Sequence, residues 1–261
     1  MNVLIVYAHP EPRSLNGALR SETVSHLRSR GHHVQVSDLY AMNWNAVVSP
    51  ADSRAPQGGA RFDPSLASRD AYEAGLQADD IAAEQEKLRW ADVLILQFPL
   101  WWFSMPAIMK GWVDRVYAYG FAYGVGEHSD THWGDRYGEG TLAGKRAMLL
   151  VTTGGWASHY APRGVNGAID DLLFPIQHGI LFYAGFDVVP PFVVYRTGRL
   201  GDDGYVRTVA ALRARLDTLD VIAPVPFRKQ NGGDYAIPAL TLREDLAPGE
   251  AGLHVHLDRT A

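Results

Sequence analysis

Hydrophobic and polar positions alternate along the chain in blocks that predict a regular succession of strands and helices. Continuous apolar runs at 3–7, 93–98 and 147–151 are typical of strands buried on both faces of a parallel sheet. A run at 34–38 that alternates with polar residues predicts an edge strand, and a fifth strand is expected at 186–194. The segments between them predict helices at 15–30, 80–89, 107–117, 169–183 and 203–221, the fourth interrupted at Pro175.

Alternating strands and helices imply parallel strands joined by right-handed crossovers. We therefore predict an α/β fold with a doubly wound, five-stranded parallel sheet, helices on both faces, and long loops at 41–78 and 120–144. Residues 1–221 are expected to form this domain. From residue 222 the composition shifts to proline, glycine and charge, which predicts an extended C-terminal tail over 222–261 that packs on the domain or on a dimer partner.

Composition narrows the possible functions. The net charge of -5 provides no basic footprint for nucleic acid, and no apolar run approaches the ~20 residues of a membrane span. The chain enters its first strand too early for a signal peptide, so we expect a cytoplasmic protein. There is no cysteine, so any redox chemistry needs a bound organic cofactor. The pairs His128/His132 and His254/His256 would suit a metal only if carboxylates converged on them, and we predict no metal site.

Three loops carry the candidate chemistry, because the loops after the first, third and fourth strands meet at one edge of such a sheet. The first starts at His9 and ends at a helix N-terminus, where free N–H groups and the helix dipole attract an anion. It contains neither a Walker A motif nor G-x-G-x-x-G, so a nucleotide would be held by backbone and polar side chains. The residues concerned are His9, Ser14, Leu15 and Asn16.

The other two loops are complementary to the first. The second supplies flat apolar walls, and the third supplies hydroxyl groups and a backbone that a ligand can approach closely. An isoalloxazine ring needs such walls together with polar partners along one edge, so the three loops together predict a flavin site. The residues are Pro99, Leu100, Trp101, Trp102 and Phe103 in the second loop, and Thr152, Thr153, Gly154 and Gly155 in the third.

The chain resembles the NAD(P)H:quinone acceptor oxidoreductase family, the DT-diaphorase type of flavodoxin-like flavoprotein. The similarity runs from residue 2 to about 220 and is weakest at 50–75, 124–140 and in the tail. The segments that carry it are Ala8-His9, Ser14-Leu15-Asn16, 37–43, Gln97-Phe98-Pro99-Leu100, Trp102-Phe103, Lys110-Gly111-Trp112, Phe121-Ala122-Tyr123, Thr152-Thr153-Gly154-Gly155, Tyr160 and Pro175-Ile176-Gln177.

The resemblance implies a homodimer with two active sites at the interface. It also implies FAD, rather than FMN, held by the three loops, with hydride passing from NADH or NADPH to the flavin and then to a quinone by a ping-pong mechanism. On this basis Tyr160 joins the loop residues above as a cofactor contact, and Tyr123, Trp102 and Phe103 line the substrate pocket.

Two departures from the family pattern bear on mechanism. The resemblance predicts a histidine six residues after the tyrosine, the two together stabilising charge at the reduced flavin, but this chain has Asn166. Asparagine can donate a hydrogen bond but cannot take up a proton near neutral pH. We expect Tyr160 and Asn166 to be the catalytic pair, with Asn166 only orienting. The second departure is Gly124-Val125, where an aromatic residue is expected; His128, Asp130, His132 and Trp133 could refill the pocket or form a solvated loop.

The leading interpretation is therefore a two-electron, NAD(P)H-dependent quinone reductase. Reduction of azo or nitro compounds needs the same hydride and stays an alternative. So does a redox-regulatory subunit of a transporter, for which 41–78 and the tail would be docking surfaces; the long third loop and tail disfavour a pure electron carrier. No basic cluster decides between NADH and NADPH, although Arg163, Arg196 and Arg199 are candidates for binding a 2′-phosphate.

Overall fold

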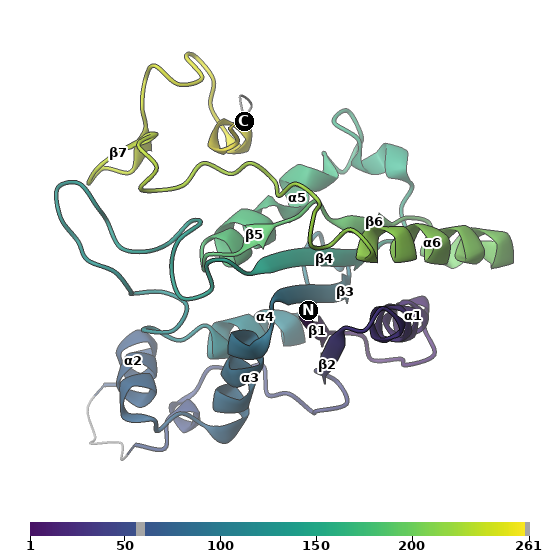
Figure 1. Cartoon of the computed structure of the whole chain (residues 1–261), viewed down its shortest axis with the longest axis horizontal. Helices are drawn as coiled ribbons and strands as arrows, with labels where there is room; N and C mark the ends of the chain where they lie inside the picture. Colours follow the sequence, from purple (N-terminus) through teal and green to yellow (C-terminus); the bar gives the residue numbers. More distant parts are fainter. Residues whose placement is uncertain (56–60, 259–261) are drawn as a thin grey trace.

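The computed structural model describes residues 1–55 and 61–258, and a parallel sheet forms its centre (Figure 1). The strand order is β2-β1-β3-β4-β5, and β6 also pairs with β4. Tyr7 pairs with Gln97, and Thr152 with both Pro99 and Val194, so the carboxyl ends of four strands meet at one edge. The strands are β1 (Asn2–Tyr7), β2 (His33–Asp38), β3 (Val93–Pro99), β4 (Arg146–Thr152), β5 (Asp187–Val188) and β6 (Phe192–Val194).

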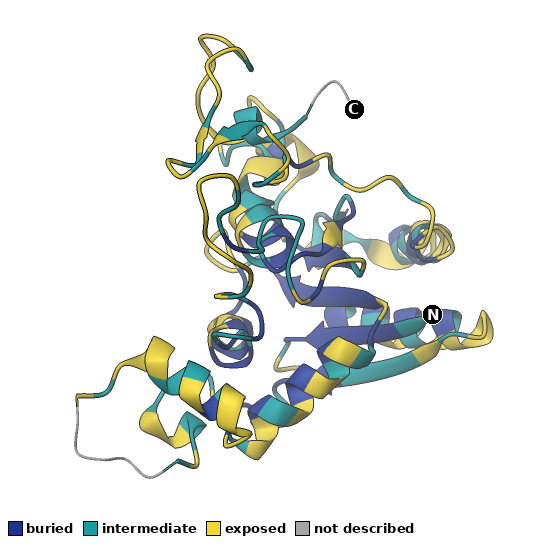
Figure 2. Ribbon diagram, turned by 60° about the vertical axis from the view of Figure 1, so that its left-hand side comes forward, coloured by how far each residue is buried: buried dark blue, intermediate teal, exposed yellow. Residues whose placement is uncertain are grey.

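Helices cover both faces of the sheet, as predicted. Helices α1 (Leu15–Ser29) and α6 (Gly201–Leu216) share one apolar core with Val3, Ile5 and Ile95. Helices α3 (Asp79–Trp90), α4 (Ala107–Val116) and α5 (Ile169–Ile176) share the other with Leu4 and Leu96. In Figure 2 the central strands β1, β3 and β4 are buried almost throughout, whereas the edge strand β2 is mostly of intermediate burial. Among the described residues, no helix combines the length and the apolar character needed to cross a membrane.

Proline explains two differences from the predicted elements. The fifth strand is broken into β5 and β6, because Pro190 and Pro191 have no N–H to offer β4. Of the helix predicted at 169–183, only the first part is the α-helix α5, which contains Pro175. The chain then continues as the π-helical segment η3 (Gln177–Phe182). The last helix also starts and ends earlier than predicted, at 201–216 instead of 203–221.

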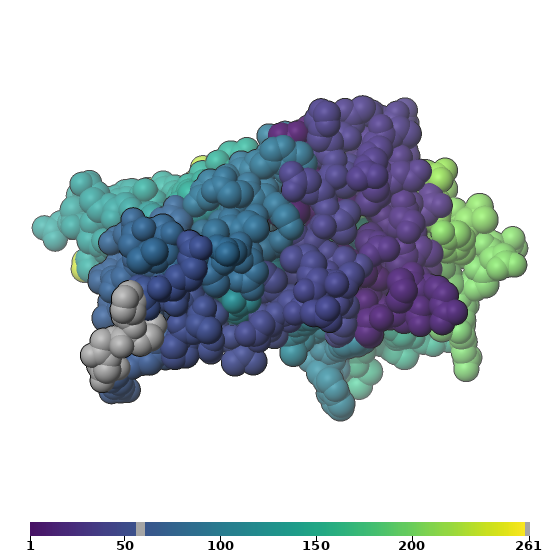
Figure 3. Space-filling model, turned by 90° about the horizontal axis from the view of Figure 1, so that it is seen from below, coloured from purple at the N-terminus to yellow at the C-terminus, as the bar shows by residue number. Residues whose placement is uncertain are grey.

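The expectation of a structureless excursion at 41–78 is wrong. It contains the 3₁₀ turn η1 (Pro50–Asp52) and helix α2 (Pro64–Ala74), while residues 56–60 lie outside the described residues. The helix starts because Asp63 accepts hydrogen bonds from the Ser65 and Leu66 amides and Pro64 occupies the first position, and it ends at Gly75, whose φ is 66°. Figure 3 shows the molecule from below, and the face seen there is formed mainly by the first half of the chain, including the described part of this excursion.

The excursion is anchored to α4 by one buried cation. Arg115 donates to Asp52 Oδ1 at 3.0 Å, to Asp80 Oδ2 at 2.7 Å and to the Asn45 carbonyl at 3.0 Å. A buried guanidinium needs all of these acceptors, because an unpaired charge there would be strongly destabilising. Segment 45–52 is therefore fixed on the domain and not displayed as a free arm.

The tail is less extended than predicted. It forms a short hairpin of β7 (Tyr235–Ala236) and β8 (Thr241–Leu242) and a 3₁₀ turn, η5 (Leu253–His256). It packs on its own domain: the Phe227 ring lies edge-on to Phe174, with 5.8 Å between centroids, and Gln230 Nε2 donates to the Trp133 carbonyl at 2.5 Å. In Figure 1 the segment between α6 and β7 runs beside α5, and the yellow hairpin and η5 project beyond it. The domain boundary at 221, and any contact of the tail with a second chain, stay predictions.

Candidate active site

The first loop ends in a helix start that exposes amide groups. Ser14 is the N-cap of α1, and its Oγ accepts from the Gly17 amide at 3.2 Å. The amides of Leu15 and Asn16 belong to the first turn, which has no intrahelical acceptor for them. A side chain at position 17 would collide with the Pro12 carbonyl at 1.9 Å, so glycine lets the loop lie directly against the helix. This geometry creates an anion-accepting corner at the sheet edge.

Asn16 connects the first loop to the two central strands. Only 4% of the residue is exposed. Its Nδ2 donates to Thr152 Oγ1 at 2.6 Å, and its carbonyl accepts from Gln97 Nε2 at 2.7 Å. The other amide oxygens, Asn16 Oδ1 and Gln97 Oε1, are buried without a hydrogen-bond partner among the described residues. Acceptors left unpaired in a buried position are costly.

The second loop is a tight turn with backbone strain. Trp101 and Ser104 exchange two backbone hydrogen bonds of 3.0 Å, and the residues between them, Trp102 and Phe103, have φ values of 48° and 62°. Left-handed backbone costs roughly 1–2 kcal/mol for each such bulky residue. Trp102 is nevertheless 95% exposed. A strained backbone that holds large aromatic rings in solvent indicates a surface that a ligand or partner covers.

The third loop is built around a buried tyrosine. Tyr160 comes from the 3₁₀ turn η2 (Ala157–Tyr160), and its Oη lies 2.8 Å from Thr153 Oγ1. A Cβ at Gly155 would lie 2.7 Å from the Tyr160 ring, whereas a Cβ at Gly154 would meet nothing within 4 Å. The two glycines therefore have different roles: Gly155 admits the tyrosine ring, and Gly154 leaves the cavity side open.

A fourth loop, which the sequence analysis missed, completes the cavity. Thr197 and Gly198 follow β6, and the Thr197 amide donates to the Thr153 carbonyl at 3.2 Å. The signal was present, because this loop also follows a strand at the same edge; the expected unbroken strand obscured it. The cavity measures about 310 Å³ and is lined by His9, Ser14, Leu15, Asn16, Pro99, Leu100, Trp101, Thr152, Thr153, Gly154, Thr197 and Gly198.

The remaining predicted residues lie outside this lining. Trp102, Phe103, Gly155 and Tyr160 border it through their neighbours in the second and third loops. Asn166 is half-buried. Its backbone N–H donates to the His159 carbonyl at 3.0 Å, which places the Asn166 backbone beside the third loop. No hydrogen bond joins its side chain to Tyr160 among the described residues.

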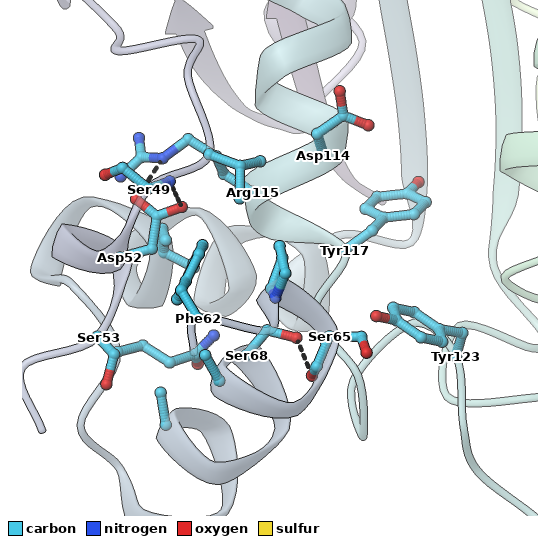
Figure 4. Close-up of a pocket in the computed structure, with 16 residues that line it drawn as sticks. Ser49, Asp52, Ser53, Phe62, Ser65, Ser68, Asp114, Arg115, Tyr117 and Tyr123 are labelled. Carbon is cyan, nitrogen blue, oxygen red and sulfur yellow. Dashed lines mark hydrogen bonds and ion pairs between the residues drawn. The ribbon is translucent and has the colours of Figure 1, made fainter. Parts of the chain in front are cut away.

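Tyr123 lies in a different cavity, between α2 and α4 (Figure 4). This cavity measures about 350 Å³, and its lining includes Phe62, Ser68, Arg115 and Tyr117. Burial raises the pKa of the Tyr123 hydroxyl, so this group stays protonated at neutral pH. Within one chain, the predicted substrate-pocket tyrosine and the cofactor loops are therefore not brought together.

The loop at 124–140 contains a group of potential metal ligands that the sequence analysis did not identify. Ligand atoms of His132, Asp135 and Glu139 all lie within 4.8 Å of one another. Protein contacts account for them: His132 Nε2 is 2.8 Å from Asp135 Oδ1, and Glu139 Oε2 accepts from Asn231 Nδ2 at 2.6 Å. His128 instead packs edge-on against Trp133, with 4.9 Å between ring centroids. The prediction that the protein has no metal site is not tested by this cluster.

The donor set at the sheet edge fits a flavin nucleotide. The helix N-terminus suits a phosphate, and Trp101 and Leu100 supply an apolar wall. The amides of Trp102 and Phe103 make no backbone hydrogen bond among the described residues and are free to bind a polar ring edge. Asn16 also lines this cavity, although its Oδ1 and Gln97 Oε1 are buried below the cavity surface.

Fold and site together define a flavodoxin-like α/β protein, and comparison with known proteins agrees. A family model described as flavodoxin-like fold matches residues 1–218. The chain is 55% identical to a ribosyldihydronicotinamide dehydrogenase-like protein, traD, of Penicillium crustosum, covering 99% of this chain and 97% of that one. It is 40% identical to NAD(P)H dehydrogenase [quinone] 1 of Rattus norvegicus, covering 86% and 79% respectively.

A solved structure is more similar still. The crystal structure of a protein from Klebsiella pneumoniae, described as a candidate quinone reductase, matches with a TM-score of 0.97 and 66% identity, over 99% of this chain and 100% of that one. The chain belongs to the NAD(P)H:quinone acceptor oxidoreductase family of flavodoxin-like flavoproteins. The resemblance predicted from the motifs is thereby confirmed.

Proposed function

We propose that this protein is an NAD(P)H-dependent two-electron quinone reductase that binds FAD at the carboxyl edge of its sheet. The observation that carries the proposal is the cavity in which loops from β1, β3, β4 and β6 present an anion-accepting corner, an apolar wall and the polar side chains of Thr152, Thr153 and Thr197. Its relatives include proteins named for NAD(P)H and quinone. The choice of FAD over FMN rests on the family resemblance of the whole segment 2–220.

Bound flavin supplies the redox chemistry, because it takes up a hydride from NAD(P)H and passes two electrons to an acceptor. The protein contributes binding and orientation. The α1 N-terminus would hold a phosphate, and the second loop would flank the ring. Donor and acceptor would use the same exposed side of the site in turn, which gives the ping-pong order.

Tyr160 is the protic group that we assign to the polar edge of the cofactor. Its hydroxyl is fixed by Thr153 Oγ1 at 2.8 Å, and Gly155 gives its ring room. The Tyr160 Oη proton can therefore be directed at an oxygen or nitrogen above the third loop. Asn166, held by its backbone beside His159, would orient this loop without transferring a proton.

A homodimer would explain why the site is incomplete in one chain. Trp102 and Phe103 are exposed, and Tyr123 lines a separate cavity. We propose that Tyr123 from a second copy reaches the flavin loops and lines the substrate pocket with Trp102 and Phe103. Sedimentation at micromolar concentration tests the assembly, with a monomer at all concentrations excluding this arrangement. A cytoplasmic location likewise stays a proposal.

The test of function is turnover with a panel of acceptors after the bound flavin has been quantified. Wild type should oxidise NADH or NADPH and reduce menadione faster than it reduces azo dyes or nitroaromatics. Gly179→Ala is the matched control, since a Cβ there meets nothing within 4 Å and Gly179 lies on η3, outside the cavity lining. Azo or nitro compounds as the fastest acceptors would move the protein to the alternative chemistry. Bound flavin without any turnover would favour a regulatory role.

A further inference from the structure

One cation at the rim of the cofactor cavity has no partner of opposite charge. The Arg196 guanidinium stacks on the Trp156 ring, with its Cζ 3.8 Å from the ring centroid. Its Nε is buried and donates to no acceptor among the described residues. No carboxylate among them forms an ion pair with Arg196 or Arg199. In a chain with a net charge of -5, such unpaired cations beside a cavity point to an anionic ligand.

The backbone places this cation beside the site. The Arg196 amide donates to the Gly155 carbonyl at 2.9 Å, and the two residues that follow Arg196 line the cofactor cavity. Arg196 itself has φ 57°, a left-handed conformation that costs a non-glycine residue of order 1–3 kcal/mol. The strain turns the chain at the end of β6, so that the side chain lies over Trp156 on the third loop.

The neighbouring ring indicates the shape of the ligand. Trp156 is 48% exposed, and one of its faces is covered by the guanidinium. The His159 ring lies 6.5 Å away, tilted by 35°. A guanidinium held flat on an indole keeps its N–H groups in one plane, ready for two parallel hydrogen bonds to a phosphate, sulfonate or carboxylate. The exposed indole and imidazole offer apolar contact to a planar group.

We propose that Arg196, stacked on Trp156, is a specificity-determining residue that binds the anionic group of a planar aromatic ligand at the mouth of the cofactor cavity. The inference rests on the proposed function and deepens it. The anion has two chemical sources: the 2′-phosphate on the adenosine end of NADPH, or an acidic substituent on the quinone. In a ping-pong mechanism NADPH and the quinone would bind in turn at the same cavity entrance. Arg199 adds a second positive charge one turn further along.

The first test measures binding without turnover. Calorimetry would compare adenosine 2′,5′-bisphosphate with adenosine 5′-monophosphate, and 1,4-naphthoquinone-2-sulfonate with 1,4-naphthoquinone, on wild type and Arg196→Gln. Losing a charge-assisted, bidentate contact should lower the affinity for the anionic ligand that Arg196 binds about tenfold. The affinity for its neutral or less charged counterpart should change by no more than about twofold. Arg196→Lys should recover only part of the affinity, because an ammonium cannot reproduce the planar fork. The anionic preference should shrink with added salt.

The matched control is Arg213→Gln. Arg213 lies on α6 and pairs with Glu22 at 2.6 Å, away from the cavity lining, and its loss should leave all four ligands unaffected. Sensitivity of the bisphosphate alone assigns the anion to the reductant, and sensitivity of the sulfonate alone assigns it to the acceptor; both outcomes support the proposal. Equal effects on anionic and neutral ligands, or none on either, would overturn it.

The second test separates this inference from the proposed function. Steady-state KM values for NADPH and NADH would be measured on the flavin-loaded variants. Arg196→Gln should raise the KM of the sensitive substrate about tenfold with kcat nearly unchanged, because the contact forms equally in ground and transition states. A protein without flavin or turnover would fail the proposed function but would leave the calorimetric result valid. Loss of kcat alone would contradict a binding role for Arg196.

Discussion

The carboxyl edge of the sheet and a further cavity, beneath the tail, are both lined by aromatic and polar side chains, but their chemistry differs. The tail cavity measures about 350 Å³ and is lined by Arg136, Tyr137, Phe174, His178, Arg228, Gln230, Tyr235, Leu240, Leu253 and His256. Under the tail, Arg228 pairs with Asp234 at 2.6 Å, and the Tyr235 hydroxyl meets His256 Nδ1 at 2.8 Å. The His178 ring is stacked between Phe174 and Tyr137, with centroids 4.6 and 4.7 Å away. The polar and aromatic side chains named here therefore have their interaction partners within the protein.

At the sheet edge the corresponding groups lack partners. Asn16 Oδ1, Gln97 Oε1 and Arg196 Nε are buried without hydrogen bonds among the described residues, and Trp102 and Phe103 have left-handed backbone. Each such feature costs about 1–3 kcal/mol. Left-handed backbone does not separate the two regions, because Tyr137 and Leu240 at the tail cavity have φ values of 53° and 54°. The regions differ in their buried polar groups, which have partners around the tail cavity and lack them at the sheet edge among the described residues.

The largest expected effect comes from filling the space that Tyr160 occupies. Gly155→Ala would put a Cβ 2.7 Å from the Tyr160 ring, which is buried and cannot yield by a simple rotation. We expect about a hundredfold loss of quinone reduction, because a small misplacement of catalytic groups has effects of this size. Gly179→Ala, an equally open glycine on η3 outside the cavity lining, should retain activity within about threefold. Steady-state kinetics check both, and an active Gly155→Ala enzyme would remove Tyr160 from the account.

The next largest effect separates stability from binding in the second loop. Trp102→Gly should raise the free energy of unfolding of the flavin-free protein by up to about 1 kcal/mol, since glycine tolerates positive φ. The same change should weaken flavin binding about tenfold by removing an aromatic contact. Trp102→Ala keeps the strained Cβ and should lose affinity without gaining stability. Unchanged flavin affinity in both variants would show that the exposed ring serves another partner.

A smaller effect tests the tail cavity through pH. Burial lowers the pKa of His178 to about 4, whereas the ordinary value is 6.5. As pH falls from 7 to 5, the unfolded chain therefore takes up a proton that the folded protein excludes, and stability falls. With allowance for solvent screening, we expect the free energy of unfolding to fall by about 1 kcal/mol between pH 7 and pH 5. Denaturant unfolding of wild type and His178→Phe at both pH values checks this, although the pKa of His256 is lowered too and leaves a residual dependence.

His178→Phe also sharpens the comparison between the two regions. Phenylalanine preserves the stack on Phe174 and Tyr137, so the variant should keep wild-type flavin affinity and quinone reduction at pH 7. A large loss of activity without a loss of stability would show that the tail cavity participates in function.

The smallest effect concerns Asn166. Asn166→Ala should lower the rate of hydride transfer by about threefold, because an orienting residue contributes less than a proton donor. Stopped-flow reduction by NAD(P)H would compare it with Asn166→Asp and wild type. Identical rates in all three would remove Asn166 from the mechanism, and a hundredfold loss in Asn166→Ala would give it a direct role.

The parts of the molecule that the sequence predicted are those with strong local signals. Apolar runs located β1, β3 and β4, and the loops that follow them contain most of the cavity lining. Helix α2 was missed because the surrounding proline, glycine, aspartate and serine residues indicate a loop, although its helical signals were present in the cap Asp63, Pro64 and Gly75. The contribution of Thr197 and Gly198 was missed because two prolines break the strand before them.

Pairing between distant side chains could not be predicted at all. The hydrogen bond between Asn16 and Thr152 joins residues 136 positions apart, and the Arg196–Trp156 stack depends on a left-handed turn at an ordinary residue. The position of Tyr123 relative to the cofactor loops depends on a second chain in our proposal, which the sequence predicts only through family resemblance.

The most direct test of the central claim is to identify and count the cofactor of the purified protein. Absorption spectroscopy and chromatography of the heat-released cofactor should give one FAD per chain, bleached by NADH or NADPH under anaerobic conditions and recoloured by menadione. Gly179→Ala, outside the cavity lining, should match wild type, whereas Gly155→Ala should bind less flavin. A colourless protein that takes up neither FAD nor FMN would contradict the assignment of the sheet edge as a flavin site.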